Sequence, residues 1–186
     1  MNIIEKHPFP PFIPNNISKL VIGSFPGREQ TQFDKSSNEW YYGAKRNQFW
    51  KILSKVYDEE LVTKSDKINF CNKNGIGITD IFLKVIRKNQ SNLDSDLIIE
   101  ENNFEFIINT LKKNQNIFVF FTSKFVQDRF LEVIPYFTNY ICLLSPSPSA
   151  NITISKSLDF QKFKTINPTS NTIDFRIDVY KKHFLK

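Results

Sequence analysis

Four short runs of apolar residues, set between longer amphipathic stretches, most constrain how this chain folds. They cover residues 19–23, 75–80, 117–122 and 140–145. Continuous apolar runs of this length, rich in branched and aromatic side chains, are typical of strands buried on both faces. We therefore predict a central, mainly parallel four-stranded sheet.

Three helical patterns fill the gaps between these runs. Residues 49–56 and 104–111 place apolar side chains at i, i+3, i+4 and i+7, and a third pattern over 125–134 ends before Pro135. Buried strands that alternate with amphipathic helices predict an α/β fold, a three-layer α/β/α sandwich. Ligands of such folds bind beyond the carboxyl ends of the strands, so functional residues are expected there.

The length of 186 residues predicts a single domain over residues 1–186. Four prolines interrupt residues 7–14, which excludes a regular helix or a central strand there. We expect residues 1–18 to form an extended, proline-rich arm laid against the body of the domain.

Scarce residue types narrow the chemistry. His7 and His183 are the two histidines, which makes a Ser-His-Asp triad or a histidine-rich metal site improbable. Cys71 and Cys142 lie far apart in the sequence, which excludes a zinc site or an iron–sulfur cluster held by cysteines. Catalysis is therefore expected from carboxylates, amides, hydroxyls or backbone N–H groups.

Charge and hydropathy suggest where the protein works. Lys and Arg exceed Asp and Glu by 25 − 19 = 6, which permits a polyanionic partner without requiring one. No apolar run approaches the roughly 20 residues of a membrane span, and residues 1–7 lack the apolar core of a signal peptide. We expect a soluble, cytoplasmic protein that does not bind membranes.

Two loops at expected strand ends carry the strongest local signals. Gly23-Ser24-Phe25-Pro26-Gly27 directly follows the first run, and its glycines allow a ligand to approach the backbone closely. It lacks the length and the Lys-Ser/Thr ending of a phosphate-binding Walker loop. The loop over residues 145–149, Ser-Pro-Ser-Pro-Ser, is either a rigid clamp for a phosphate backbone or an ordinary turn. Gly75 and Gly77 are expected in tight turns.

Together these segments resemble the uracil-DNA glycosylase superfamily. The Gly-x-x-Pro-Gly loop is followed by an aromatic-Tyr-Gly stretch with Asn-x-Phe-Trp (residues 41–50), by residues 75–81, and by the Ser-Pro-Ser loop. Ser24 after the first glycine, and Leu93-Asp94-Ser95 with Leu97, make the chain most similar to the hypoxanthine-DNA glycosylase branch, ahead of the mismatch-specific branch.

The resemblance implies base excision from DNA and assigns catalytic positions. Glycosylases flip the target nucleotide into a pocket before the bond between sugar and base is hydrolysed. Asn47 matches the asparagine that handles water in the hypoxanthine branch, and Ser24 stands where another branch has glutamate. Phe25 stands where several branches carry Asn or Asp. The alternative for Asn47 is to cap the helix that begins near Phe49.

Base-binding positions follow from the same resemblance. Tyr42 matches the aromatic residue that stacks on the flipped base, with a core position as its alternative, and Phe25 is expected to form another wall. Asp80 matches a base-reading asparagine; its carboxylate can accept a ring N–H, or it can cap a helix over residues 81–86. Gly23 is expected to lie against the base.

The resemblance also implies a DNA-binding surface and a mechanism. Its expected members are the loop serines, a neighbouring asparagine and three basic side chains: Ser145, Ser147, Ser149, Asn151, Lys45, Arg46 and Lys124. The reaction would be hydrolysis through an oxocarbenium-like sugar cation in a monomer without metal or cofactor, and without lyase activity.

Two alternatives remain. One is a catalytically weak or inactive nucleic-acid-binding module of the same fold. The other is an unrelated hydrolase of a small metabolite, against which the lack of a G-x-S-x-G nucleophile elbow argues.

Overall fold

A four-stranded parallel sheet forms the centre of the computed structural model, which describes residues 3–32 and 39–185. Its strand order is β3–β2–β6–β7, and each strand pairs in parallel with its neighbours. The strands are β2 (Lys19–Gly23), β3 (Ile76–Asp80), β6 (Phe118–Phe121) and β7 (Tyr140–Cys142). The predicted parallel sheet is therefore confirmed, with each strand inside the apolar run that indicated it.

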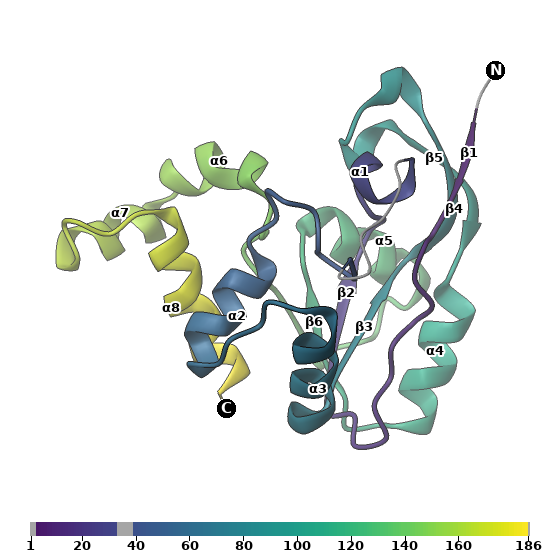
Figure 1. The fold of residues 1–186 in the computed structure, drawn as a ribbon, viewed down its shortest axis with the longest axis horizontal. Helices are drawn as coiled ribbons and strands as arrows, with labels where there is room; N and C mark the ends of the chain where they lie inside the picture. The colour runs from purple at the N-terminus through teal and green to yellow at the C-terminus, as the bar shows by residue number, and fades with distance from the viewer. Residues whose placement is uncertain (1–2, 33–38, 186) are drawn as a thin grey trace.

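Helices cover both faces of this sheet and confirm the three-layer sandwich (Figure 1). On one face, Val21 and Phe120 pack in a core with α2 (Phe49–Tyr57), α3 (Lys64–Asn74) and α8 (Thr172–Phe184). On the other, Leu20 and Ile22 pack in a core with α4 (Phe104–Lys113) and α5 (Lys124–Val133). Successive residues of a strand point to opposite faces, which explains why a continuous apolar run serves two cores.

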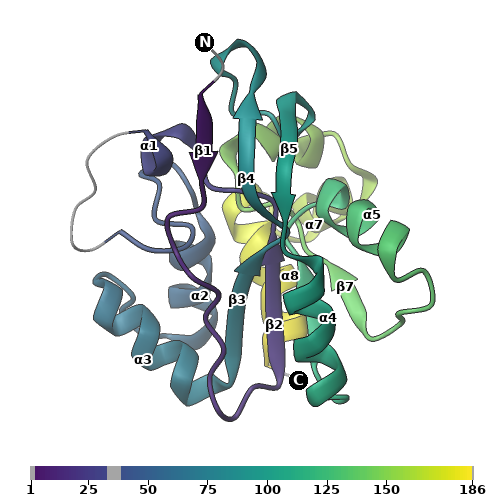
Figure 2. The same cartoon turned by 90° about the vertical axis from the view of Figure 1, so that its right-hand side faces the viewer.

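A second, antiparallel sheet was not predicted (Figure 2). It has the order β1–β4–β5, and its strands are β1 (Ile4–Lys6), β4 (Phe82–Arg87) and β5 (Leu97–Asn102). The helix considered for residues 81–86 is therefore wrong. Short apolar segments are ambiguous between helix and strand, and pairing with partners distant in the sequence decided this one.

The N-terminal arm runs along the domain without a helix. The Phe12 and Ile78 backbones exchange two hydrogen bonds of 2.9 and 2.8 Å, and the His7 amide donates to the Leu83 carbonyl at 2.8 Å. At the start of the arm, buried Glu5 pairs with Arg87 of β4 at 3.0 Å. These contacts hold the arm beside the carboxyl end of β3.

Hydrogen bonds decide the ionisation of Glu5. Burial pushes its pKa upward, but donors from Thr31, Arg87 and Gln32 outweigh that effect, so the pKa lies below its usual value of 4.5. The carboxylate is therefore stabilised by folding, and this stabilisation depends on its being ionised.

The remaining elements are short or C-terminal. They are α1 (Arg28–Thr31), α6 (Asn151–Ser155), α7 (Leu158–Ile166) and the single 3-10 turns η1 (Lys88–Gln90), η2 (Asp94–Asp96) and η3 (Pro148–Ala150). Gly75 ends α3 in the left-handed conformation at φ 62°, which turns the chain tightly into β3. Within the described residues, no helix is long and apolar enough to cross a membrane.

Candidate active site

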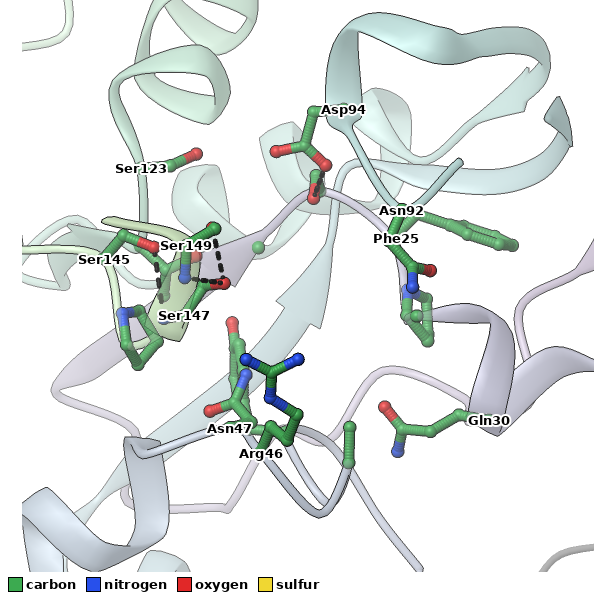
Figure 3. Close-up of a pocket in the computed structure, with 18 of the residues that line it drawn as sticks. Phe25, Gln30, Arg46, Asn47, Asn92, Asp94, Ser123, Ser145, Ser147 and Ser149 are labelled. Atoms are coloured by element: carbon green, nitrogen blue, oxygen red, sulfur yellow. Dashed lines mark hydrogen bonds between the residues drawn. The ribbon is translucent and has the colours of Figure 1, made fainter. Parts of the chain in front are cut away.

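A cavity of about 600 Å³ opens at the carboxyl ends of the parallel strands (Figure 3). Its walls come from the loops that follow β2, β3, β6 and β7, together with the segment before α2 and the turn after β4. The lining residues are 23–30, 41–42, 44, 46–47, 80, 92–94, 122–123 and 145–149. Ten of the expected site residues therefore meet in one place: Gly23, Ser24, Phe25, Tyr42, Arg46, Asn47, Asp80, Ser145, Ser147 and Ser149.

Gly23 ends β2 where two side chains converge on its backbone. A Cβ atom at this position would lie 2.3 Å from Asp80 Oδ1 and 2.7 Å from the Tyr42 hydroxyl. Both separations are far below van der Waals contact, so only glycine fits here. The missing side chain lets a carboxylate and a phenol approach the same point of the cavity floor.

Asp80 presents one carboxylate oxygen and has the other in a hydrogen bond. Oδ2 lies 2.9 Å from His7 Nε2, and both side chains are almost fully buried, at 7% and 3% exposed. Oδ1 is also buried and has no hydrogen-bond partner among the described residues. His7 thus orients Asp80 and leaves one acceptor atom unused beside the cavity.

Tyr42 is held by its ring and leaves its hydroxyl unused. The ring packs on Phe49 at 4.4 Å between centroids, and the backbone is in the left-handed region at φ 55°. For a bulky residue this conformation is strained, and such strain often occurs at functional sites. The buried hydroxyl makes no well-formed hydrogen bond with the described residues. Burial and then the nearby Asp80 charge raise its pKa well above 10, and the neighbouring Thr122 hydroxyl opposes this effect. The Tyr42 hydroxyl remains a neutral hydrogen-bond donor.

Asn47 lies both at the start of α2 and at the cavity wall. Its Oδ1 accepts from the Phe49 amide at 2.9 Å, so the side chain supports the first turn of α2. It also lines the cavity. Oδ1 is engaged, and the Nδ2 amide, a donor, has no hydrogen bond to the part of the chain that the structure describes.

Ser24 is bonded to a carboxylate that was not expected in the site. Its Oγ donates to Asp94 Oδ1 at 2.7 Å, and Asp94 lines the cavity. Burial raises the pKa of Asp94, the Asp80 charge adds to this effect, and the Ser24 bond and Arg87 oppose it. Asp94 therefore joins Asp80 and Glu29 as a third carboxylate at the cavity wall.

The serine loop is held from behind by a buried arginine of α8. Arg176 is 0% exposed, and its guanidinium donates to the carbonyls of Ser145 at 2.7 Å and Ser147 at 3.2 Å. The hydroxyls of Ser147 and Ser149 are 2.8 Å apart and share a hydrogen bond. The loop is thus fixed as a unit, with Ser145, Ser147 and Ser149 at the cavity wall.

Three expected site residues lie outside the cavity. Asn151 accepts from Arg176 at 2.8 Å through Oδ1, which makes it part of the support behind the loop. Lys124 pairs with Asp128 at 2.8 Å, one turn along α5, with its side chain 70% exposed. Lys45 is exposed beside Arg46, which does line the cavity.

His7, Asp94 and Arg176 were missed by the sequence analysis. His7 and Arg176 carry no local pattern, because their partners are 73 and 31 residues away in the sequence. Asp94 stood in a segment that contributed to the resemblance, but no role was attached to it. No three of the described His, Cys, Asp and Glu side chains come together in a way that could hold a metal ion.

Comparison with known proteins places this cavity in a family. The family model of the Uracil DNA glycosylase superfamily matches residues 10–169 of this chain. A hypoxanthine DNA glycosylase of Methanosarcina barkeri (strain Fusaro / DSM 804) is 29% identical over 119 residues, which are 63% of this chain and 71% of that protein.

A solved structure agrees in fold. The solution NMR structure of a Methanosarcina acetivorans protein assigned to the uracil DNA glycosylases superposes with a TM-score of 0.64, over 98% of this chain and 97% of that one. At 21% identity this likeness shows the common fold. Since the superfamily match extends over most of the sequence, the chain belongs to the uracil DNA glycosylase superfamily.

Proposed function

We propose that this protein is a monofunctional DNA glycosylase that removes a deaminated base, hypoxanthine or uracil, from a flipped nucleotide. The observation that carries the proposal is the pair of unpartnered buried atoms, Asp80 Oδ1 and the Tyr42 hydroxyl, beside Gly23. A buried polar atom without a partner is destabilising by about 1–3 kcal/mol. A ligand that supplies both partners would therefore be favoured.

The two atoms form an acceptor and a donor on one wall. Hypoxanthine presents a ring N–H beside a carbonyl oxygen, and uracil presents the same pair. Asp80 Oδ1 can accept from the N–H, and the Tyr42 hydroxyl can donate to the carbonyl. Adenine has a bare lone pair at the corresponding ring nitrogen, which would face the carboxylate and be rejected.

The cavity wall supports a hydrolytic reaction on DNA. The serine loop offers hydroxyls at the wall, and Arg46 adds a positive charge suited to a phosphate. No lysine lies among the described residues of the wall, so a Schiff base with the sugar has no nucleophile there. That arrangement supports hydrolysis without lyase activity.

A single-turnover cleavage assay tests this function. Labelled duplexes and single strands would carry hypoxanthine, uracil, xanthine or adenine, with alkaline cleavage of abasic sites as the readout. We expect product from hypoxanthine or uracil and none from adenine. Asn47→Ala should lower the rate, whereas Asn72→Ala, which changes an exposed residue of α3, should not.

One other outcome would contradict the proposed function, and another would change only the role of Asn47. DNA binding without product from any base would identify a binding module instead. The resemblance favours that possibility at one position, because Phe25 stands where it implies Asn or Asp in several branches. Equal product from wild type and Asn47→Ala would keep the glycosylase and remove Asn47 from its mechanism.

A further inference from the structure

We propose that Asp94, held by Ser24, is the catalytic carboxylate that accepts a proton from the attacking water and faces the sugar cation. This inference rests on the proposed glycosylase function and deepens it. Breaking the bond between sugar and base leaves positive charge on the sugar, which a nearby carboxylate stabilises. The loop after β2 contains no carboxylate in residues 23–27, so another segment must supply one.

The position of Asp94 meets this need. Asp94 opens η2, in the connection between β4 and β5, and is brought over the end of β2 by the fold. The Ser24 hydroxyl donates to Asp94 Oδ1 and so fixes the carboxylate beside the loop that follows β2. Figure 3 shows the Asp94 carboxyl group and Asn47 on opposite sides of the cavity.

One oxygen of this carboxylate is left for the reaction. Ser24 is the hydrogen-bond partner of Oδ1, and within the described residues Oδ2 has neither a hydrogen bond nor an ion pair. Arg87, the one described cation whose charge lowers the pKa of Asp94, has hydrogen bonds to other groups. It binds Glu5 at 3.0 Å, the Ser91 carbonyl at 3.2 Å and the Pro26 carbonyl. Among residues 3–32 and 39–185, no Lys or Arg forms an ion pair with Asp94.

The surroundings make Asp94 a stronger base than an ordinary carboxylate. The charged side chains that share its cavity are Asp80, Arg28, Glu29 and Arg46, with Arg87 behind the wall. Burial and the Asp80 charge raise the pKa of Asp94, and a carboxylate with a raised pKa accepts a proton more readily. Asp80 differs, because one of its oxygens is bonded to His7 and the other lies beside Gly23.

The proposed reaction is hydrolysis of the bond between the sugar and the base. The bond between C1′ and the base nitrogen breaks, and its electron pair leaves with the base. The water oxygen forms the new bond to C1′, and Asp94 Oδ2 takes one water proton. That proton passes through solvent to the base nitrogen, so the net change is addition of water across the bond. Asn47 Nδ2 is a hydrogen-bond donor, so Asn47 cannot take the proton that this step assigns to Asp94.

The first test separates chemistry from binding. Asp94→Asn keeps the shape and the acceptor for Ser24 but cannot take the proton. We expect the single-turnover rate to fall by about 100-fold or more, with duplex affinity changed by less than about threefold. Asp96→Asn, in the same turn but outside the cavity, should keep the wild-type rate.

Ser24→Ala provides a positioning readout. Because the Ser24 bond lowers the pKa of Asp94, its loss should move the acid limb of the rate profile to higher pH. A change in rate without this displacement would show that Ser24 does not act through Asp94. Cleavage by Asp94→Asn within about tenfold of wild type would overturn the proposal and leave the glycosylase function standing.

The second test needs no turnover and is independent of which base is removed. Affinities would be measured for duplexes with a cationic pyrrolidine abasic analogue and with a neutral tetrahydrofuran analogue. Wild type and Asp96→Asn should prefer the cationic duplex by about tenfold or more, and Asp94→Asn should lose the preference. If no base is cleaved but this pattern holds, the carboxylate assignment stands and the base assignment fails. Absence of the preference in wild type would overturn the role of Asp94.

Discussion

Replacement of Arg176 tests whether the serine loop depends on support from α8. The guanidinium is fully buried and donates to four residues besides the carbonyl of Thr172: Ser145, Ser147, Asn151 and Gln48. The two shortest bonds, to Ser145 at 2.7 Å and Asn151 at 2.8 Å, each involve a charged donor. Such bonds contribute about 1.5–3 kcal/mol each, or about 3–6 kcal/mol together.

Arg176→Met keeps the apolar stem and removes all of these donors. Removal of a buried charge also relieves its desolvation, so we expect the lower end, about 3 kcal/mol of lost unfolding free energy. The unfolding free energy of Arg176→Lys should lie between those of wild type and Arg176→Met, because an ammonium group keeps the charge but cannot reproduce the planar hydrogen-bonding geometry of guanidinium. Urea unfolding followed by circular dichroism measures both.

Lys182→Met is the matched control on the same helix. Its side chain is 64% exposed and pairs with Asp178, so its replacement should change the unfolding free energy by less than about 0.5 kcal/mol. If Arg176→Met destabilised the protein no more than this control does, the hydrogen bonds of Arg176 would not stabilise the serine loop, and this prediction would be refuted.

Three further perturbations follow from single contacts. Gly23→Ala should destabilise the protein by about 1–3 kcal/mol and abolish cleavage, because its Cβ would overlap Asp80 and Tyr42. Gly27→Ala, whose Cβ would have its nearest atom 3.7 Å away, should leave the unfolding free energy unchanged. Tyr42→Phe removes an unpartnered buried hydroxyl, so thermal unfolding should show equal or higher stability while cleavage of hypoxanthine or uracil slows. Glu5→Gln should destabilise the protein at neutral pH, and the difference from wild type should shrink as pH falls below 4.5, since the lowered pKa of Glu5 makes its contribution disappear on protonation. A difference independent of pH in urea titrations would contradict that assignment.

The parallel sheet and the helices that alternate with it were predictable, because their signals are local. Residues 19–23 or 117–122 are apolar enough to be buried on both faces wherever they pair, and 49–56 can bury only one face. The antiparallel sheet was not predictable in this way. Residues 82–87 are compatible with helix or strand, and pairing with β1 and β5 decided between them.

In the candidate active site, too, some features were predictable from the sequence and others depended on contacts between distant segments. Sequence order alone indicated that Gly23, Asp80 and the serine loop follow strands, and parallel strands bring such ends to one edge. It could not indicate that His7 binds Asp80 across 73 residues or that Ser24 binds Asp94 across 70. Strand and helix signals extend over a few neighbours, whereas hydrogen bonds between distant loops depend on three-dimensional packing. The sequence by itself determined the layers and which loops face the ligand; the tertiary structure decided which oxygen of each carboxylate is held and which is left for chemistry.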